Sequence, residues 1–439
     1  MESWQTLDLL AALVEKSLVV YEETAEGQGR YRMQETLRQY SRDRLLESGE
    51  GEVMRDQHQA FFAHWVESGP QTPRGNEARL WWECLETEHD NLRAAMHWQT
   101  GQAGNVQAQV ALRLANRLTS FWGERGFVSE GRGHLTDLLQ ATQNDVKATE
   151  LRIAALKGAG DLAIAQGDLP QATSYLTECL RLCGEHGYRE KSGETLMALG
   201  IVAVHKGNND EARACFEQSL AVFEELGDTK FLVVAALNLG TLAVMQGELD
   251  VSEKALTQAL RTSESYGYTE HTVRALHNLG LVAYYRRDWS QSRRLYERSL
   301  SLSREAGSRH GIARTQGSLA NTLLRQNETV LARAALQESL FLSQSFGDRP
   351  YIALLLESFA DLAEIKQQPL RAVQILGAAH KLREQIGVPL SKDEQAEYDR
   401  TFAALQATAN PSEWNTAWNA GLAFTLDQAI GYALDGADQ

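Results

Sequence analysis

Residues 193–227 read GETLMALGIVAVHKGNNDEARACFEQSLAVFEELG, and residues 233–267 read VVAALNLGTLAVMQGELDVSEKALTQALRTSESYG. Both segments carry glycine at their eighth, fifteenth and last positions, and they begin 40 residues apart. The same period holds without a slip from residue 153 to residue 391, which gives six repeats. With 34 glycines in 439 residues, chance would place fewer than one glycine in the last of these columns, yet all six places are filled. Self-similarity at a fixed period of this size predicts a solenoid.

Each repeat is predicted to be a pair of helices. In the second repeat we expect a first helix ending at 206, a turn over 207–210 and a second helix over 211–226. Apolar residues recur in the second helix at the three- and four-residue spacing of one helix face. Three columns define the pair: small residues in the first helix (Gly160, Gly200, Gly240, Gly280, Ala320, Ala360), small residues opening the second (Ala172, Ala212, Ser252, Ser292, Ala332, Ala372) and bulky residues four positions later (Leu176, Phe216, Leu256, Tyr296, Leu336, Leu376). One such hairpin cannot bury its apolar face alone, so we expect the hairpins to stack.

The turns of the hairpins divide the repeats into two groups. The glycine that closes each second helix fits a left-handed cap, where a Cβ would be penalised. At the turn between the two helices, the first three repeats have Gly167, Gly207 and Gly247, whereas the last three have Arg287, Asn327 and Gln367. If this position is left-handed, a residue other than glycine costs about 1–2 kcal/mol there, and less if it is asparagine.

This pattern resembles the tetratricopeptide repeat in a long form. The small residues, the turn and the bulky residue stand where that family has them, over residues 149–390. We therefore expect an all-α, right-handed tetratricopeptide-like solenoid over 105–390, made of six 40-residue repeats after one degenerate hairpin at 105–140.

The first 50 residues are a different kind of sequence. A helix over 4–16, a β-hairpin and a helix over 35–48 form the second half of a winged helix. The segments LDLLAALVEKSLVV (7–20) and RYRMQETLRQYSRDRLLESGE (30–50) resemble the winged helix of bacterial signal-transduction ATPases and LuxR-like large transcriptional regulators. In that family it lies between an NTPase module and a tetratricopeptide sensor. The sequence has no G-x-x-x-x-G-K-[ST] phosphate loop, so the resemblance implies the C-terminal part of a larger regulator.

Two helical segments complete the predicted organisation. Residues 51–104 read as a connector, and the stretch EARLWWECLETEHDNLRAAMHW (77–98) resembles the connector of the same regulators. Residues 391–439 read as a cap, in which EWNTAWNAGLAFTLDQAIGYAL (413–434) resembles their closing segment. We expect the apolar side chains of this stretch to cover the end of the solenoid.

Composition excludes several classes of function. The net charge is −15, which disfavours binding to nucleic acid and to anionic membranes. No apolar run reaches the ~18 residues of a membrane span, and four cysteines without metal spacing fit a reducing compartment, so we expect a cytoplasmic protein. We find no catalytic motif, and we expect no enzyme activity, no metal and no cofactor.

The candidate site is the inner wall formed by the first helices of the repeats. Positions six before, two before and one after the first small column need not pack, so they are free to bind a ligand. The resemblance implies that, in peptide-binding relatives, an asparagine two residues before the first small column forms hydrogen bonds with the backbone of the ligand. An arginine fork beside it suits carboxylate or phosphate. The predicted binding residues are Asn238, Arg274, His277, Asn278, Tyr284, Tyr285, Arg314 and Asn321.

Several interpretations stay open from the sequence alone. The arginine-rich region 286–314 is either a solvated helix face or a site for an acidic peptide or partner surface. We expect a protein- or peptide-binding sensor arm that also contacts an NTPase module absent from this sequence. The alternatives are a free-standing adaptor for protein assembly and a nucleic-acid binder acting through the winged helix. Against the last, the expected recognition helix carries Asp8 and Glu15 beside a single Lys16.

Overall fold

The computed structural model describes residues 3–23, 29–71, 75–98, 106–387, 392–408 and 410–435. The chain forms two compact units, Met1–Gln71 with Trp82–Ala155, and Thr72–Trp81 with Leu156–Gln439. The predicted domain boundaries at 50, 104 and 390 stay predictions. The expected degenerate hairpin is present as two helices and groups in the first unit with the connector apart from Thr72–Trp81.

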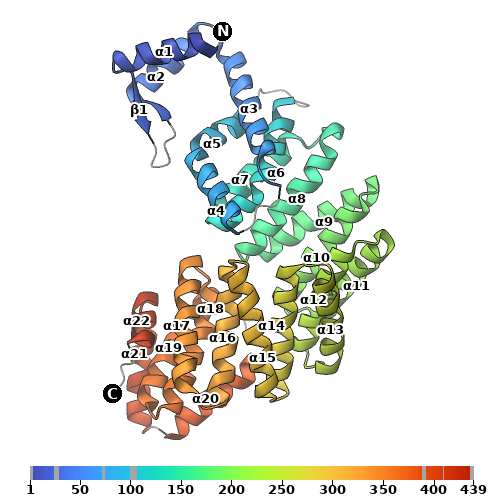
Figure 1. Cartoon of the computed structure of the whole chain (residues 1–439), viewed down its shortest axis with the longest axis vertical. Coiled ribbons are helices and arrows are strands. Elements are labelled where there is room, and N and C mark those ends of the chain that lie inside the picture. The colour runs from blue at the N-terminus through green and yellow to red at the C-terminus, as the bar shows by residue number, and fades with distance from the viewer. Residues whose placement is uncertain are drawn as a thin grey trace. The chain divides into compact units, whose positions relative to one another are not determined.

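The first unit begins with one helix, one hairpin and a second helix (Figure 1). These are α1 (Ser3–Glu15), β1 (Val19–Glu23), β2 (Gly29–Met33) and α2 (Glu35–Glu47). The strands are antiparallel, with Val19 opposite Met33 and Tyr21 opposite Tyr31. Val19 is buried, whereas none of the residues of α2 is. The segment is therefore a small hairpin element with little core of its own, as half of a winged helix would be.

The connector and the first hairpin follow. Their helices are α3 (Gly51–Ser68), α4 (Gly75–Thr87), α5 (His89–His97), α6 (Val106–Arg125), α7 (Val128–Ala141) and the short 3₁₀ helix η1 (Val146–Ala148). Gln59 fastens α3 to the end of α5, because its amide donates hydrogen bonds to the carbonyl oxygens of Ala95 (2.8 Å) and Trp98 (3.0 Å). Gly131 lies directly under the indole of Trp122, which lets α7 approach α6 closely.

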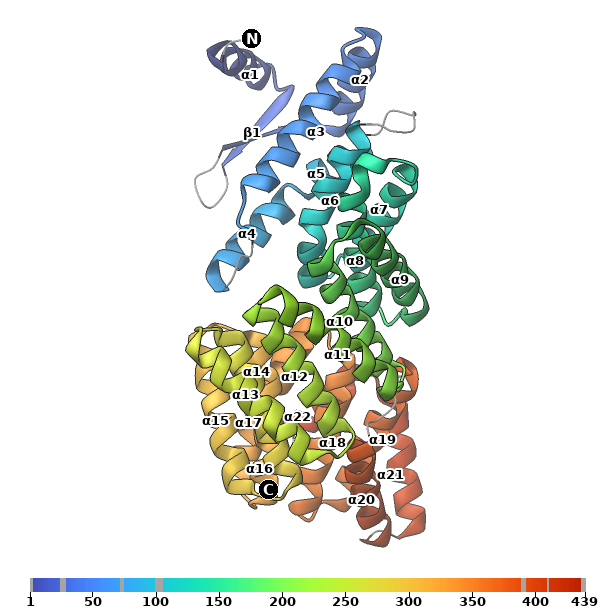
Figure 2. The ribbon, with the colours of Figure 1, turned by 90° about the vertical axis from the view of Figure 1, so that its right-hand side faces the viewer.

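Six helical hairpins form the repeat array, as predicted, and Figure 2 shows them from the side. The pairs are α8 (Thr149–Ala165) with α9 (Leu169–His186), α10 (Arg189–His205) with α11 (Asn209–Leu226), α12 (Thr229–Met245) with α13 (Leu249–Ser265), α14 (Thr269–Tyr285) with α15 (Trp289–Glu305), α16 (Arg309–Arg325) with α17 (Thr329–Phe346), and α18 (Arg349–Ile365) with α19 (Pro369–Ile386). From α9 to α19, each helix packs against the next one in the chain, which is the arrangement of a tetratricopeptide-like solenoid.

The small columns hold the two helices of a hairpin together. A Cβ added at Gly280 would lie 2.6 Å from the ring of Tyr296, so the aromatic side chain fills the space that glycine leaves. The serines of the second column add a hydrogen bond to the same contact: Ser292 donates to the carbonyl oxygen of Gly280 (2.9 Å), and Ser252 to that of Gly240 (2.8 Å). The predicted close approach of the two helices is confirmed.

Both predicted left-handed positions are confirmed. The six closing glycines have φ between 66° and 76°. At the inner turn, Arg287, Asn327 and Gln367 have φ of 62°, 62° and 60°, close to the glycines of the earlier repeats. The last three hairpins thus have the same turn conformation as the first three, but with a strained backbone at the residue that replaces glycine.

Three helices cap the array: α20 (Lys392–Thr408), α21 (Pro411–Ala423) and α22 (Leu426–Leu434). Helix α21 packs tightly on α19, since a Cβ at Gly377 would lie 2.8 Å from the carbonyl oxygen of Trp418. Arg333 donates to the carbonyl oxygen of Leu434 (3.0 Å), which places a cation at the negative end of α22. Trp414, Trp418, Phe424 and Leu426 pack against the core of the last repeats, as the sequence predicts for a cap.

Among the described helices, none is both long enough and apolar enough to cross a membrane.

Candidate functional site

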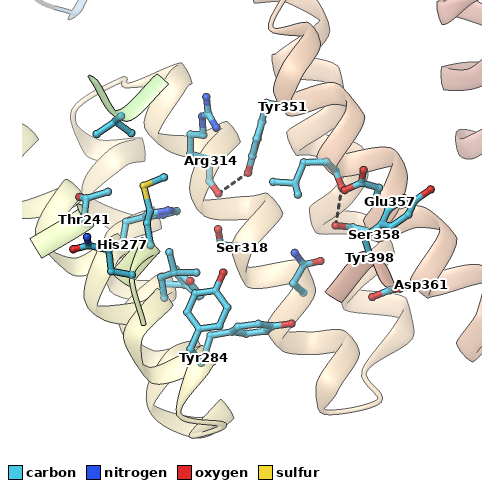
Figure 3. Close-up of a pocket in the computed structure, with 18 of the residues that line it drawn as sticks. Thr241, His277, Tyr284, Arg314, Ser318, Tyr351, Glu357, Ser358, Asp361 and Tyr398 are labelled. Atoms are coloured by element: carbon cyan, nitrogen blue, oxygen red, sulfur yellow. Dashed lines mark hydrogen bonds between the residues drawn. The ribbon is translucent and has the colours of Figure 1, made fainter. Parts of the chain in front are cut away.

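A cavity of about 1,100 Å³ opens on the inner helices of the second unit (Figure 3). Its walls come mainly from the ends of α10 and α12, from α14, α16 and α18, and from α20 of the cap, with single residues from α11, α15 and α19. The residues at the position one after the first small column line it in four successive repeats: Thr241, Leu281, Asn321 and Asp361. The 40-residue period therefore brings equivalent side chains to one surface.

Tyrosines make up much of the wall. Tyr284 and Tyr285 lie edge to face with ring centroids 5.7 Å apart, and Tyr296, Tyr351 and Tyr398 complete the set. Burial raises the pKa of Tyr351 to about 12 and, with help from Glu357, that of Tyr398 to about 12. These phenols stay protonated at neutral pH, so they offer hydrogen bonds and apolar ring faces without adding negative charge.

Arg314 lies in one part of the cavity, on α16. Its guanidinium stacks on the ring of Tyr351 at 4.0 Å, and its Nη2 donates to Asp348 at 3.0 Å. The Tyr351 hydroxyl in turn donates to the backbone carbonyl oxygen of Arg314 (2.9 Å), as Figure 3 shows. The arginine is thereby held in place from two sides while 43% of its side chain remains exposed.

Two carboxylates, Glu357 and Asp361, lie in another part of the cavity (Figure 3). Both are paired inside the protein. Glu357 accepts from Arg383, whose Nη2 lies 2.8 Å away, and both side chains are largely buried. Asp361 accepts from Arg325 and Arg400, each at 3.2 Å, and from the hydroxyl of Thr401. Since Arg400 and Thr401 belong to α20, these bonds attach the cap to the wall of the cavity.

His277 contributes a neutral polar group from α14. Its Nδ1 is buried and has no hydrogen-bond partner among the described residues. Burial, and then the charge of Arg314, lower the pKa of His277 to about 4. The imidazole is therefore uncharged at neutral pH, with an unsatisfied nitrogen in the wall of the cavity.

The structure separates the eight predicted residues into two groups. His277, Tyr284, Tyr285, Arg314 and Asn321 line the cavity. Asn238, Arg274 and Asn278 do not belong to its lining and connect neighbouring repeats instead: Arg274 donates to the amide oxygen of Asn238 (3.1 Å), and Asn278 donates to the hydroxyl of Thr241 (2.7 Å). That these residues bind a ligand stays a prediction; the three bridging residues make their bonds to neighbouring repeats in this structure.

Other lining residues were not among the candidates. Ser318 and Ser358 occupy the same column as the two asparagines, so the periodicity did mark their positions. Tyr351 and Glu357 lie on α18 at positions that the columns left aside. Tyr398 and Thr401 come from α20, outside the repeats, where no periodic signal could have placed them.

The arginine-rich region forms ion pairs across the repeats. Arg286 pairs with Asp250 (2.5 Å) and Glu253 (2.7 Å), and Arg293 pairs with Glu328 (2.7 Å). Arg298 and Arg304 pair in the same way with Glu264 and Glu338 of adjacent repeats. Acidic residues far along the sequence thus neutralise much of this region, which favours the solvated-face interpretation over a basic docking site.

Two families match parts of the chain. Residues 191–265 and 271–345 match the tetratricopeptide repeat, and residues 1–46 match a winged helix-turn-helix domain. The chain thus carries a winged helix-turn-helix segment followed by tetratricopeptide repeats.

Curated relatives support a distant link to transcriptional regulators. A 140-residue stretch is 35% identical to "Putative HTH-type transcriptional regulator Rv0890c" of Mycobacterium tuberculosis and to "Putative HTH-type transcriptional regulator Mb0914c" of Mycobacterium bovis. That stretch is 32% of this chain and only 15% of the length of each regulator.

Among solved structures, the crystal structure of a Rap protein complexed with competence and sporulation factor has a similar fold. Its TM-score is 0.50 at 11% sequence identity, and the match covers 84% of this chain and 99% of that one. At this identity the likeness concerns the fold alone.

Proposed function

We propose that the chain is the protein- or peptide-binding sensor arm of a larger signalling or transcription-regulating ATPase, with its ligand held in the cavity of the solenoid. The cavity itself is the main support for this function. Its volume of about 1,100 Å³ is at the upper end of the ~300–1,000 Å³ range of typical small-molecule pockets. A short peptide is the ligand class that suits a site of this size lined by several successive repeats.

The chemistry of the wall also suits a peptide. Asn321 and Ser318 offer neutral donors and acceptors for backbone amides, while the tyrosines, Leu281 and the uncharged ring of His277 offer contact surface. The ladder of equivalent positions, Thr241, Leu281, Asn321 and Asp361, brings one side chain to the cavity from each of four successive repeats, as an extended ligand requires.

The regulatory part of the proposal rests on the relatives. The matched stretch is 15% of the length of each regulator, which leaves room in proteins of that kind for the NTPase module that the proposal requires. Ligand binding would favour one curvature of the solenoid, which the winged helix would relay. Effects of this kind need a coupling free energy on the order of 1–3 kcal/mol. We assign no catalytic role to this chain and no cofactor.

A pair of matched variants tests the site. Asn321→Phe fills the cavity, whereas Gln258→Phe makes a comparable amide-to-phenyl change at an exposed position of α13. Peptides selected from a random pool by the whole wild-type chain should be retained by Gln258→Phe and lost by Asn321→Phe, with circular dichroism confirming intact helices in both. Equal retention by the two variants would place binding outside the cavity, and no retained peptide on the wild type would contradict the proposed function.

The alternatives make different predictions. An adaptor would bind folded proteins on its outer helices, and its complexes would survive Asn321→Phe. A nucleic-acid binder would use the segment that matches the winged helix-turn-helix family, residues 1–46. In the structure Arg30 of the hairpin is paired with Glu88, and Arg38 and Arg44 pair with acids on their own helix. Binding to a DNA duplex that weakens steeply with salt would favour this alternative.

A further inference from the structure

Arg314 differs from the other arginines around the cavity in how its donors are used. Arg325, the second arginine of the lining, donates to the Tyr284 hydroxyl (3.1 Å) as well as to Asp361, and only 19% of its side chain is exposed. Arg314 makes one side-chain hydrogen bond within the described chain, from Nη2 to Asp348. A guanidinium has five N–H donors in a planar fork, so most of this fork remains open to a ligand.

The position of Arg314 is fixed although most of its donors are open. The stacking on Tyr351 orients the plane of the guanidinium, and the Tyr351 hydroxyl is tied to the backbone of the same arginine. A pre-oriented fork loses little conformational entropy when it binds, which is the property of a recognition group.

We propose, on the basis of the function proposed above, that Arg314 binds a carboxylate of the ligand, and that this carboxylate displaces Asp348 from the guanidinium. The carboxylate belongs either to an acidic side chain or to the C-terminus of a peptide, since both present the same planar pair of oxygens. Asp348 occupies the site of this anion in the unliganded protein.

A monocarboxylate fits the surroundings better than a phosphate dianion does. The neighbouring His277 is neutral at neutral pH, so it adds no second positive charge. Glu357 and Asp361 line the same cavity and already hold Arg383, Arg325 and Arg400, so these arginines are not available to neutralise a second charge. One arginine whose fork is shared only with Asp348 matches one carboxylate in a bidentate arrangement once Asp348 is displaced.

The displacement links ligand binding to the joint between two repeats. Asp348 lies in the turn between α17 and α18 and caps α18, since it accepts a hydrogen bond from the backbone N–H of Tyr351 (3.2 Å). The Arg314–Asp348 pair therefore connects the fifth repeat to the start of the sixth. At the equivalent place one repeat earlier stands Ser308, which has no carboxylate to offer. Loss of the Arg314–Asp348 pair on ligand binding would remove this contact between the fifth and sixth repeats.

The test uses the whole chain and three pools of short synthetic peptides that share one randomised sequence free of Asp and Glu. The first pool ends in a free carboxylate, the second is amidated and carries one Glu, and the third is amidated with Gln in place of that Glu. The proteins are the wild type, Arg314→Gln, Asp348→Asn and the control Arg294→Gln, which changes an exposed arginine of α15 away from the cavity. Asparagine caps a helix as well as aspartate does, so Asp348→Asn removes the competing charge and keeps α18 intact.

We expect the wild type and Arg294→Gln to retain the first or second pool in preference to the third, and the preferred pool identifies the source of the carboxylate. Arg314→Gln should weaken this retention by about tenfold, the loss expected for a charge-assisted pair. Asp348→Asn should strengthen it by roughly fivefold, since the peptide no longer competes with an internal partner.

The results that would contradict the carboxylate proposal differ from the result that would contradict peptide binding itself. Equal retention of all three pools by the wild type, or retention by Asp348→Asn no stronger than by the wild type, would overturn the carboxylate proposal and leave peptide binding standing. Retention of none of the pools by the wild type would overturn the proposed function and this inference with it.

Discussion

Within the repeats, three described residues other than glycine have a left-handed backbone, namely Arg287, Asn327 and Gln367, and Ser17, after α1, is a fourth outside the repeats. Each of the three within the repeats adopts a left-handed conformation that the first three repeats give to glycine. Asparagine tolerates this region better than arginine or glutamine do, because its short side chain can bond locally. The strain should therefore be unequal among the three hairpins.

We predict that Arg287→Gly and Gln367→Gly each stabilise the protein by about 1 kcal/mol, the strain relieved minus part of the added unfolded-state entropy. Both side chains are exposed, so little packing is lost. Midpoints of urea unfolding measure the effect, and Asn327→Gly is the matched control with a smaller gain. A gain for Asn327→Gly as large as for Arg287→Gly would show that strain is not the cause.

His277 predicts a loss of stability in acid. Its folded pKa of about 4 lies below the ordinary histidine value of 6.5, so the folded state resists protonation. The contribution is complete above pH 6.5 and is lost as the pH falls from 6.5 towards 4. Its size is on the order of 3 kcal/mol, since one pKa unit corresponds to ~1.4 kcal/mol. The variant His277→Leu, which copies Leu237 of the preceding repeat, should unfold with a smaller pH dependence over this window; an unchanged pH profile would contradict the assignment.

At the scale of the helices, pairs of columns determine how closely two helices pack. The two aromatic residues of the bulky column, Phe216 and Tyr296, face Gly200 and Gly280, and Leu176 and Leu256 also face glycines. Alanine stands in the small column only in the last two repeats, where the bulky residue is leucine. Gly280→Ala should destabilise the protein by about 1–3 kcal/mol, the usual cost of overpacking. Combined with Tyr296→Leu it should cost less than the sum of the two single changes. A double-mutant cycle on thermal unfolding measures this coupling, and additive effects would refute it.

The cap makes a second prediction about helix contacts. A Cβ at Gly421 of α21 would collide with the backbone carbonyl of Gln374 on α19, which cannot move aside as a side chain can. Gly421→Ala should therefore loosen the cap and speed hydrogen exchange in α20, α21 and α22. Gly431→Ala is the matched control, because no described atom lies within 4 Å of its Cβ position and alanine favours the helix. Equal exchange in the two variants would contradict this packing of α21 on α19.

At the scale of the whole molecule, periodicity predicted the hairpins, their left-handed turns and the inner face that carries the cavity. It did not predict which side chains of that face line the cavity and which ones bond to neighbouring repeats. Asn238, Arg274 and Asn278 reach across to neighbouring repeats and bond there, and a pattern within one repeat cannot show partners in the next. The contribution of α20 was equally out of reach, because Tyr398 and Thr401 approach the cavity from outside the array.

The same limit explains the arginine-rich region. In the sequence this region looks like an unneutralised basic cluster, because its acidic partners lie 33–36 residues away along the chain. Stacking brings these acids beside the arginines and leaves a chain of ion pairs between repeats. Such exposed pairs contribute little each, at ~0–1 kcal/mol, but they match one repeat to the next in register.

Site-specific photo-cross-linking in living cells tests most directly whether the cavity is where this protein meets its ligand. A photoreactive phenylalanine analogue would replace Leu281 in the cavity wall or, as the control, Gln258 on the exposed face of α13. We predict an adduct of peptide mass, or a defined peptide segment of a partner, on the chain labelled at 281 and not on the chain labelled at 258. Adducts at 258 alone, or the same adducts at both positions, would contradict a ligand site in the cavity.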